Sequence, residues 1–229
     1  MLFAPFLIIY GILLFLLLGF VFVLIQIGVI HYAFQMLGLS PNLAFLALLA
    51  SLIGSYVNIP VTRIHGGTTH PMEVVNRFGV RYRVPTRYAG DGTTTIAINF
   101  GGAIVPILIS FYVLNAQPGA ILPALLAVAI VAAVVHRFAR PVPGLGIATP
   151  MFIPPIVAAL TAWFLGSLFA VPYHIDAIAY VGGTMGTLVG ADILNLRRIG
   201  DLGAPVASIG GAGTFDGVFL TGIVAVLLA

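Results

Sequence analysis

The sequence predicts an all-α polytopic membrane protein with about seven transmembrane helices, forming a single integral membrane domain over residues 1–229. Of the 229 residues, 61% are hydrophobic and only 7% are charged, whereas soluble domains carry roughly 25% charged residues. So few polar groups could not cover the surface of a soluble globule. A spanning helix needs about 20 residues, so the chain has room for about seven crossings and their connections.

The membrane spans are delimited by clusters of polar residues, glycine and proline between apolar runs. The N-terminal segment MLFAPFLIIYGILLFLLLGF lacks a basic region, and its apolar run exceeds that of a signal peptide, so we expect a retained membrane helix. The expected spans are residues 4–30, 41–60, 93–115, 119–136, 150–171 and 176–196, followed by a seventh that starts after LRRIGDLGAP and ends the chain.

The basic residues indicate the orientation of these spans. All nine are arginines, and each falls in a connection on the same side of the predicted membrane domain. Under the positive-inside rule that side is cytoplasmic, which places the N-terminus inside and the C-terminus outside in a multipass protein of the cell membrane. One missed or added span would scatter the arginines over both sides. They are Arg63, Arg77, Arg81, Arg83, Arg87, Arg137, Arg140, Arg197 and Arg198.

The loop 61–92 is the longest polar stretch of the chain. Around Gly79, the residues Val80 and Tyr82 alternate with arginines, a period of two that is typical of a strand. We expect a small β-hairpin on the cytoplasmic surface, packed against helix ends because an isolated hairpin is marginal. Anionic lipid headgroups would attract its basic side chains. These are Arg77, Arg81, Arg83 and Arg87.

The same loop contains the metal candidates His65, His70 and Glu73, in the stretch HGGTTHPME. Imidazole and carboxylate groups suit zinc. The spacing is not that of HExxH, however, and the glycines form no fixed helical face, so a polar turn is the favoured interpretation. The chain has no cysteine, which excludes disulfides and thiolate sites. No metal, cofactor or nucleotide-binding loop is predicted.

The sixth span combines a glycine stripe with an acid. Gly182, Gly186 and Gly190 repeat every four residues, which lets another helix approach closely. Asp192 lies off that stripe, about one turn inside the cytoplasmic end, with Asn195 one turn onward. Asp192 either extends to the membrane interface or belongs to a functional site.

Several spans are interrupted by residues that weaken helices. The third span begins DGTTTIAINFGGAIVP, with Asp91 at its mouth and Asn99 inside it. Broken membrane helices are tolerated only where protein or a water-filled cavity satisfies the freed backbone groups. We therefore expect a polar cavity that opens toward the cytoplasm. Its candidate cavity-lining or ion-binding residues are Asp91, Asn99, Asn195, Gly211, Gly213 and Thr221.

The seventh span contains the segment GGAGTFDGVFLTG, in which Asp216 follows three glycines and precedes a fourth. If the helix began at Pro205, Asp216 would lie near the bilayer centre. If residues 210–213 are unwound instead, a helix over about 211–229 spans roughly 28 Å, about one hydrocarbon thickness. Asp216 then lies at the level of Asp192. A charged aspartate at a helix centre costs about 2.5–3.5 kcal/mol, so such a residue indicates a functional site; a polar contact to Thr221 or a backbone amide is the structural alternative.

These residues resemble the GxGD intramembrane aspartyl proteases, the presenilin and signal peptide peptidase type. In that family one aspartate lies in a span running toward the cytoplasm and its partner follows GxG in the next span; Asp192 and Gly211-Ala212-Gly213 with Asp216 match this order. Two features differ: Asp216 stands two residues later than in GxGD, and Ala191 replaces the usual tyrosine. The chain also resembles prokaryotic multipass membrane proteins of unknown function that share a GGAGTFDG-like terminal segment.

Two active functions follow, beside a non-catalytic membrane scaffold. In an aspartyl protease-like hydrolase, Asp192 and Asp216 would be the catalytic pair, because two close carboxylates share a proton at neutral pH. In a proton- or cation-coupled transporter or channel, Asp216 would bind the ion and Asp192 and Asn99 would line its path. The expected partners are the lipid bilayer and either a membrane peptide or a small solute or proton, with no nucleic acid.

Overall fold

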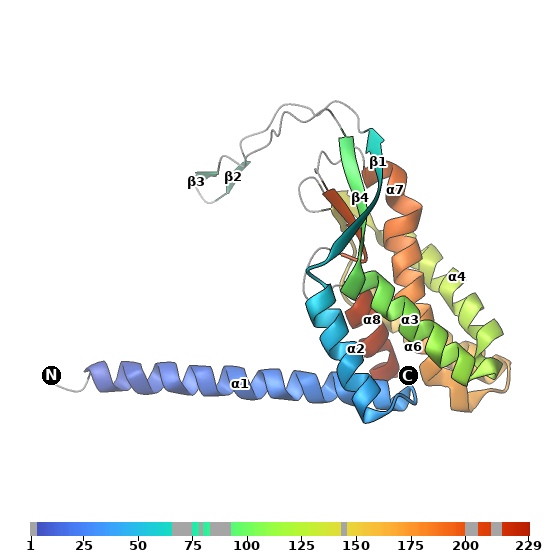
Figure 1. The fold of residues 1–229 in the computed structure, drawn as a ribbon, viewed down its shortest axis with the longest axis horizontal. Coiled ribbons are helices and arrows are strands. Elements are labelled where there is room, and N and C mark those ends of the chain that lie inside the picture. The colour runs from blue at the N-terminus through green and yellow to red at the C-terminus, as the bar shows by residue number, and fades with distance from the viewer. Residues whose placement is uncertain are drawn as a thin grey trace.

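The computed structural model describes residues 4–65, 75–77, 80–82, 93–142, 146–199, 206–211 and 217–229. The chain is mostly helical, with a small β-sheet at one end of a helical bundle (Figure 1). The α-helices are α1 (Ala4–Met36), α2 (Pro41–Gly54), α3 (Val105–Ala116), α4 (Ile121–Phe138), α5 (Ile153–Leu168), α6 (Ile175–Thr187), α7 (Leu196–Ile199) and α8 (Gly217–Leu228).

Shorter helical segments of other types flank these helices. Two are π-helices, η1 (Phe100–Ile104) before α3 and η4 (Leu188–Asp192) after α6. Three are 3₁₀ turns, η2 (Pro118–Ala120), η3 (Pro172–His174) and η5 (Ile193–Asn195). π-Helical turns within α-helices are rare and are frequent at functional sites, so η1 and η4 mark the part of the bundle to inspect for function.

Three helical stretches of the described chain are long and apolar enough to cross a membrane: Gly11–Met36, Pro118–Phe138 and Pro172–Asn195. Four shorter apolar stretches accompany them, at Pro41–Gly54, Phe100–Ala116, Ile153–Leu168 and Gly217–Leu228. Many large apolar side chains on α1, α3, α4 and α5 are exposed, which is the surface expected of a protein in a lipid bilayer. The predicted class, a helical membrane protein, agrees with this architecture.

A three-stranded sheet replaces parts of the predicted second and third spans. Strand β1 (Asn58–His65) pairs antiparallel with β4 (Thr93–Asn99), and β4 pairs parallel with β7 (Val206–Ile209). The prediction of helix at 55–60 and 93–99 was therefore wrong. Pro60 lacks an N–H and holds the preceding residue extended, and the threonines and isoleucines of TTTIAIN favour strand because they are β-branched.

The described residues also include two short antiparallel hairpins. Strands β2 (Val75–Arg77) and β3 (Val80–Tyr82) pair antiparallel, which confirms the hairpin predicted in loop 61–92. Arg77 and Arg81 lie in its two strands, whereas Arg83 and Arg87 fall outside the described residues. A second hairpin joins β5 (Arg140–Val142) to β6 (Gly146–Ala148).

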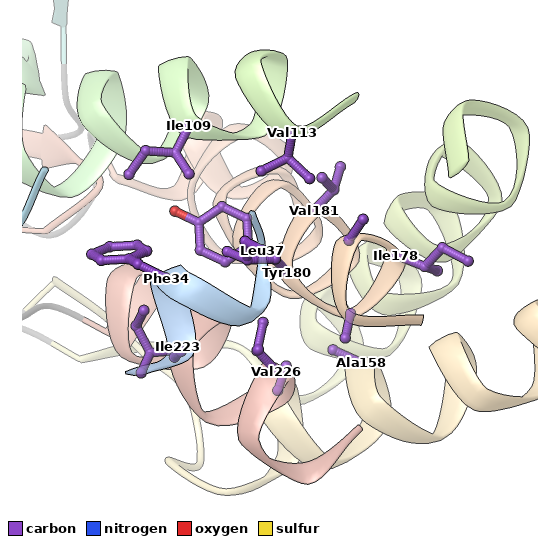
Figure 2. Packing of buried hydrophobic residues seen from close by; sticks show 14 of the residues in the cluster. Phe34, Leu37, Ile109, Val113, Ala158, Ile178, Tyr180, Val181, Ile223 and Val226 are labelled. Carbon is purple, nitrogen blue, oxygen red and sulfur yellow. The ribbon is translucent and has the colours of Figure 1, made fainter. Parts of the chain in front are cut away.

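Helix α6 is at the centre of the bundle and contacts α3, α4, α5 and α8. Its glycine stripe lets another helix approach closely, as predicted, and that helix is α4: a Cβ on Gly182 would lie 2.8 Å from the Cβ of Ala127, and one on Gly186 would lie 2.7 Å from that of Val131. The close approach buries α6 and fixes its rotation. Tyr180 on another face of α6 packs edge-on against Phe34 of α1 (Figure 2).

Helix α1 extends away from the bundle at a steep angle (Figure 1). Side chains between residues 11 and 29 are exposed, whereas Phe34 and Leu37 at its C-terminal end are fully buried in the core. Phe34 also stacks edge-on against Phe219 of α8. The last turns of α1 therefore anchor it to the bundle, and residues 11–29 present a largely apolar, exposed surface.

Candidate functional site

Asp192 is the last residue of the π-helix η4, where the regular α6 ends. Its carboxylate Oδ2 accepts a hydrogen bond of 2.7 Å from the backbone N–H of Gly210, and its side chain is partly buried. Gly210 directly follows β7, so the bond joins the end of the sixth predicted span to the segment that precedes α8. Asp216 lies outside the described residues, one position before Gly217, where α8 begins.

Two glycines between β7 and α8 are in left-handed conformations. Gly210 has φ +82° and Gly211 has φ +85°, a region that suits glycine because it has no Cβ. The prediction that the first glycines of GGAGTFDG are not helical is thereby confirmed for these two. The predicted helix does not start at Gly211 itself, which is left-handed; the described part of α8 begins at Gly217, and residues 212–216, Gly213 among them, fall outside the described residues.

Gly210 packs against the backbone of the π-helix η1. A Cβ on Gly210 would lie 2.7 Å from the backbone N of Ala103 and 2.8 Å from the carbonyl carbon of Gly102, and a Cβ on Gly102 would overlap the carbonyl oxygen of Gly210. Both glycines are buried. Three interrupted segments, η1, η4 and the chain after β7, therefore meet at one point beside Asp192.

Asn99 organises the other side of this junction. Its Oδ1 caps η1 by accepting a bond of 2.7 Å from the N–H of Gly102, while its Nδ2 donates to the carbonyl of Ser55 and to Oδ1 of Asn58. Asn58 Oδ1 also accepts from the hydroxyl of Ser208 in β7. Asn99 is fully buried, so its side chain links α2, β1, η1 and β7 through bonds to protein groups.

The remaining candidate cavity residues lie apart from this junction or outside the described chain. Asn195 is buried and donates to the carbonyls of Gly190 and Ala191, beside a contact to His136 of α4. Thr221 donates to the carbonyl of Gly217 within α8. Asp91 falls outside the described residues.

The metal candidates are not brought together by what the structure describes. His65 is the last residue of β1, paired with Thr93, and both His70 and Glu73 fall outside the described residues. Among the residues that are described, no group of three or more His, Asp or Glu side chains is placed to hold a metal ion.

Comparison with models of known protein families gives one match, which covers residues 52–228. It includes the sheet, both π-helices, Asp192 and the segment with Asp216. The chain belongs to the family described as protein of unknown function (DUF1614). Helix α1 and most of α2 precede the part shared with DUF1614. Searches of curated proteins and of solved structures found no match.

Membership of DUF1614 confirms the predicted resemblance to a membrane protein family of unknown function. The resemblance to GxGD proteases continues to rest on the residues themselves. Sequence reasoning missed the roles of Gly102, Asn58 and Ser208. The one available signal was the pair of double glycines, Gly101-Gly102 and Gly210-Gly211. Gly102 and Gly210 are the two that touch.

Proposed function

We propose that this protein is an intramembrane hydrolase of the aspartyl protease type, with Asp192 and Asp216 as its catalytic pair. Two neighbouring carboxylates share a proton because both cannot easily be charged at once. The charged one would take a proton from water as it attacks a peptide carbonyl, and the protonated one would donate a proton to the leaving amine.

The hydrogen bond from Gly210 to Asp192 carries this proposal. It docks the segment that leads to Asp216 directly onto the first aspartate. Asp216 follows Gly210 by six residues and precedes the first residue of α8 by one. The contacts of Gly210 with Gly102 and Ala103 hold the segment in place, which is the positional control that a two-carboxylate site requires.

Strand β7 supports a peptide as the substrate. It lies at the edge of the described three-stranded sheet and leads directly into Gly210. An edge strand presents N–H and C=O groups to which an extended peptide adds by backbone hydrogen bonds. A peptide paired with Val206–Ile209 would run close to Asp192.

Reconstitution into liposomes tests the proposal. The vesicles would contain labelled transmembrane peptides and enclose a pH-sensitive dye. We expect peptide cleavage without a protein-dependent change of internal pH. A pH change without cleavage would favour a proton-coupled transporter, and neither signal from folded protein across a broad peptide panel would favour a membrane scaffold; both results would overturn the proposal.

We further propose that the chain crosses the cell membrane seven times, with its N-terminus in the cytoplasm and its C-terminus outside. The one-sided distribution of arginines supports this, as does the packing of the shorter apolar helices α3, α5 and α8 against α6.

Single cysteines test this orientation, because the natural chain has none. Tyr173, between α5 and α6, is 94% exposed, and Val61 in β1 at the opposite end of the bundle is 60% exposed. An impermeant maleimide added to intact cells should label Tyr173→Cys and should label Val61→Cys only after permeabilisation. The reverse pattern, or equal labelling of both sites, would contradict the orientation.

A further inference from the structure

Helix α6 has a second face beside its glycine stripe, formed by Tyr180, Thr184 and Thr187. These residues are four and three positions apart, so their side chains lie on one side of the helix. We call them the hydroxyl face of α6. All three are buried, at 0%, 1% and 2% exposed, which is unusual for hydroxyl groups in the centre of an apolar bundle.

Thr184 of this face and Ser110 of α3 have two hydroxyl protons for three hydrogen-bond contacts. Thr184 Oγ1 donates 2.7 Å to the carbonyl of Tyr180, and Ser110 Oγ of α3 donates 2.8 Å to the carbonyl of Pro106. The two oxygens nevertheless lie 3.3 Å apart. Because a hydroxyl carries one proton, neither can donate to the other while both backbone bonds persist. The two protons therefore serve three contacts, and one of the three is left without a donor.

Three other hydroxyls of the core have a proton but no acceptor for it. Tyr180 OH and Thr187 Oγ1 have no hydrogen-bond partner, and neither does Ser51 Oγ of α2. The oxygen of Tyr180 points from its ring toward Phe34 and Ile109, both apolar (Figure 2). Burying a hydroxyl without a partner is unfavourable, so three protons in this core need an acceptor.

We propose that bound water molecules occupy the core along the hydroxyl face of α6. Water both donates and accepts, so it can donate to Ser110 and Thr184 and accept from Tyr180 and Thr187. Buried waters typically bridge polar groups that otherwise lack partners. A cation would bind the lone pairs of Ser110 and Thr184 but would offer nothing to the unpaired protons.

The position of this water suggests its use. From Tyr180 to Thr187 the face covers about 10 Å along the helix axis, at 1.5 Å per residue. The π-helix η4 follows at once and ends at Asp192. The hydroxyl face thus ends at Thr187, on the side of the bundle where Asp192 lies. Water bound there would be available close to that carboxylate. The water site itself does not depend on Asp192 being catalytic.

X-ray radiolytic footprinting of the full chain in lipid nanodiscs tests this, because hydroxyl radicals formed from bound water modify adjacent side chains. After correction for intrinsic reactivity, we expect Tyr180 to be modified several-fold faster than Phe34 and Phe219, which are equally buried. Exposed Tyr173 provides the upper reference. Modification of Tyr180 as slow as that of the two phenylalanines would overturn the proposal.

The variant Thr187→Val gives an independent test, because valine matches threonine in shape and lacks the hydroxyl. If water is bound to Thr187, its loss removes a hydrogen bond, and Tm falls together with the modification of Tyr180. In a dry core the substitution removes an unpaired polar group, which leaves Tm unchanged or raises it. An unchanged or raised Tm would therefore overturn the proposal. Thr184→Val, which loses a bond to backbone in either case, calibrates the size of the shift.

Discussion

Replacing Asp192 with asparagine is expected to lower peptide cleavage by the reconstituted protein by about 10²–10⁴-fold, the range for loss of a general acid or base. Asparagine cannot take up or release the proton that the reaction requires. It keeps an oxygen that can accept the hydrogen bond from Gly210, so the junction should stay folded. The rate is measured with labelled transmembrane peptides in liposomes, and Tm is measured on the same preparation.

Asp176→Asn is the matched control for this variant. Asp176 lies in the first turn of α6, which continues through η4 to Asp192, and it is also partly buried, at the opposite end from Asp192. We expect Asp176→Asn to cleave at the wild-type rate. Wild-type cleavage by Asp192→Asn would contradict a catalytic role, and equal losses in both variants would point to a general effect of removing acids from α6.

Gly210→Ala is expected to destabilise the protein by about 2–5 kcal/mol. A left-handed conformation costs an L-residue about 1–2 kcal/mol, and Gly210 has φ +82°. The new methyl group would also overlap backbone atoms of Gly102 and Ala103, and overpacking adds about 1–3 kcal/mol. Thermal unfolding in detergent or nanodiscs measures the loss, and cleavage should fall with it because Gly210 positions the segment beside Asp192.

Gly38→Ala separates the two causes. Gly38 has φ +83°, nearly the same as Gly210, yet a Cβ there would have no neighbour within 4 Å. The free energy of unfolding of this variant should fall only by the cost of the left-handed backbone conformation, about 1–2 kcal/mol. If Gly38→Ala and Gly210→Ala were equally destabilised, the close contact between Gly210 and η1 would contribute nothing to stability.

The longer helices were predictable because long apolar runs must satisfy their backbone groups internally in lipid. The span predicted at 119–136 corresponds to α4 at Ile121–Phe138, and that at 150–171 to α5 at Ile153–Leu168. The glycine stripe of α6 was also readable, because a four-residue repeat of glycine has a direct packing consequence.

The sheet was not predictable by the same route. The hydropathy argument assigned every apolar run to a helix, so the β-branched alternation of TTTIAIN was read as the start of a span. The pairing of β4 with β7 joins Thr95 to Val206, which are more than 100 positions apart, and no local pattern in either segment reveals the other.

The candidate site was predictable in part. An acid inside an apolar span is costly, and that cost made Asp192 a candidate. The docking of Gly210 onto Asp192 and the contact of Gly210 with Gly102 depend on tertiary packing between distant segments. Asn99 was predicted to line an ion path; the structure gives it hydrogen bonds to Gly102, Ser55 and Asn58. The pairing of Asp192 with Asp216 stays a prediction.

Cross-linking tests most directly whether the two aspartates meet. The natural chain has no cysteine, so the double variant Asp192→Cys/Asp216→Cys can be treated with a short bifunctional thiol reagent and analysed by mass spectrometry. Gly183→Cys/Ala225→Cys is the positive control, since a Cβ on Gly183 would lie 3.4 Å from that of Ala225, close enough for a disulfide. Asp176→Cys/Asp216→Cys is the negative control, because Asp176 lies about 24 Å from Asp192 along the helix axis.

Our account predicts a cross-link between positions 192 and 216 and none between 176 and 216. Absence of the 192–216 cross-link while the positive control links would contradict it.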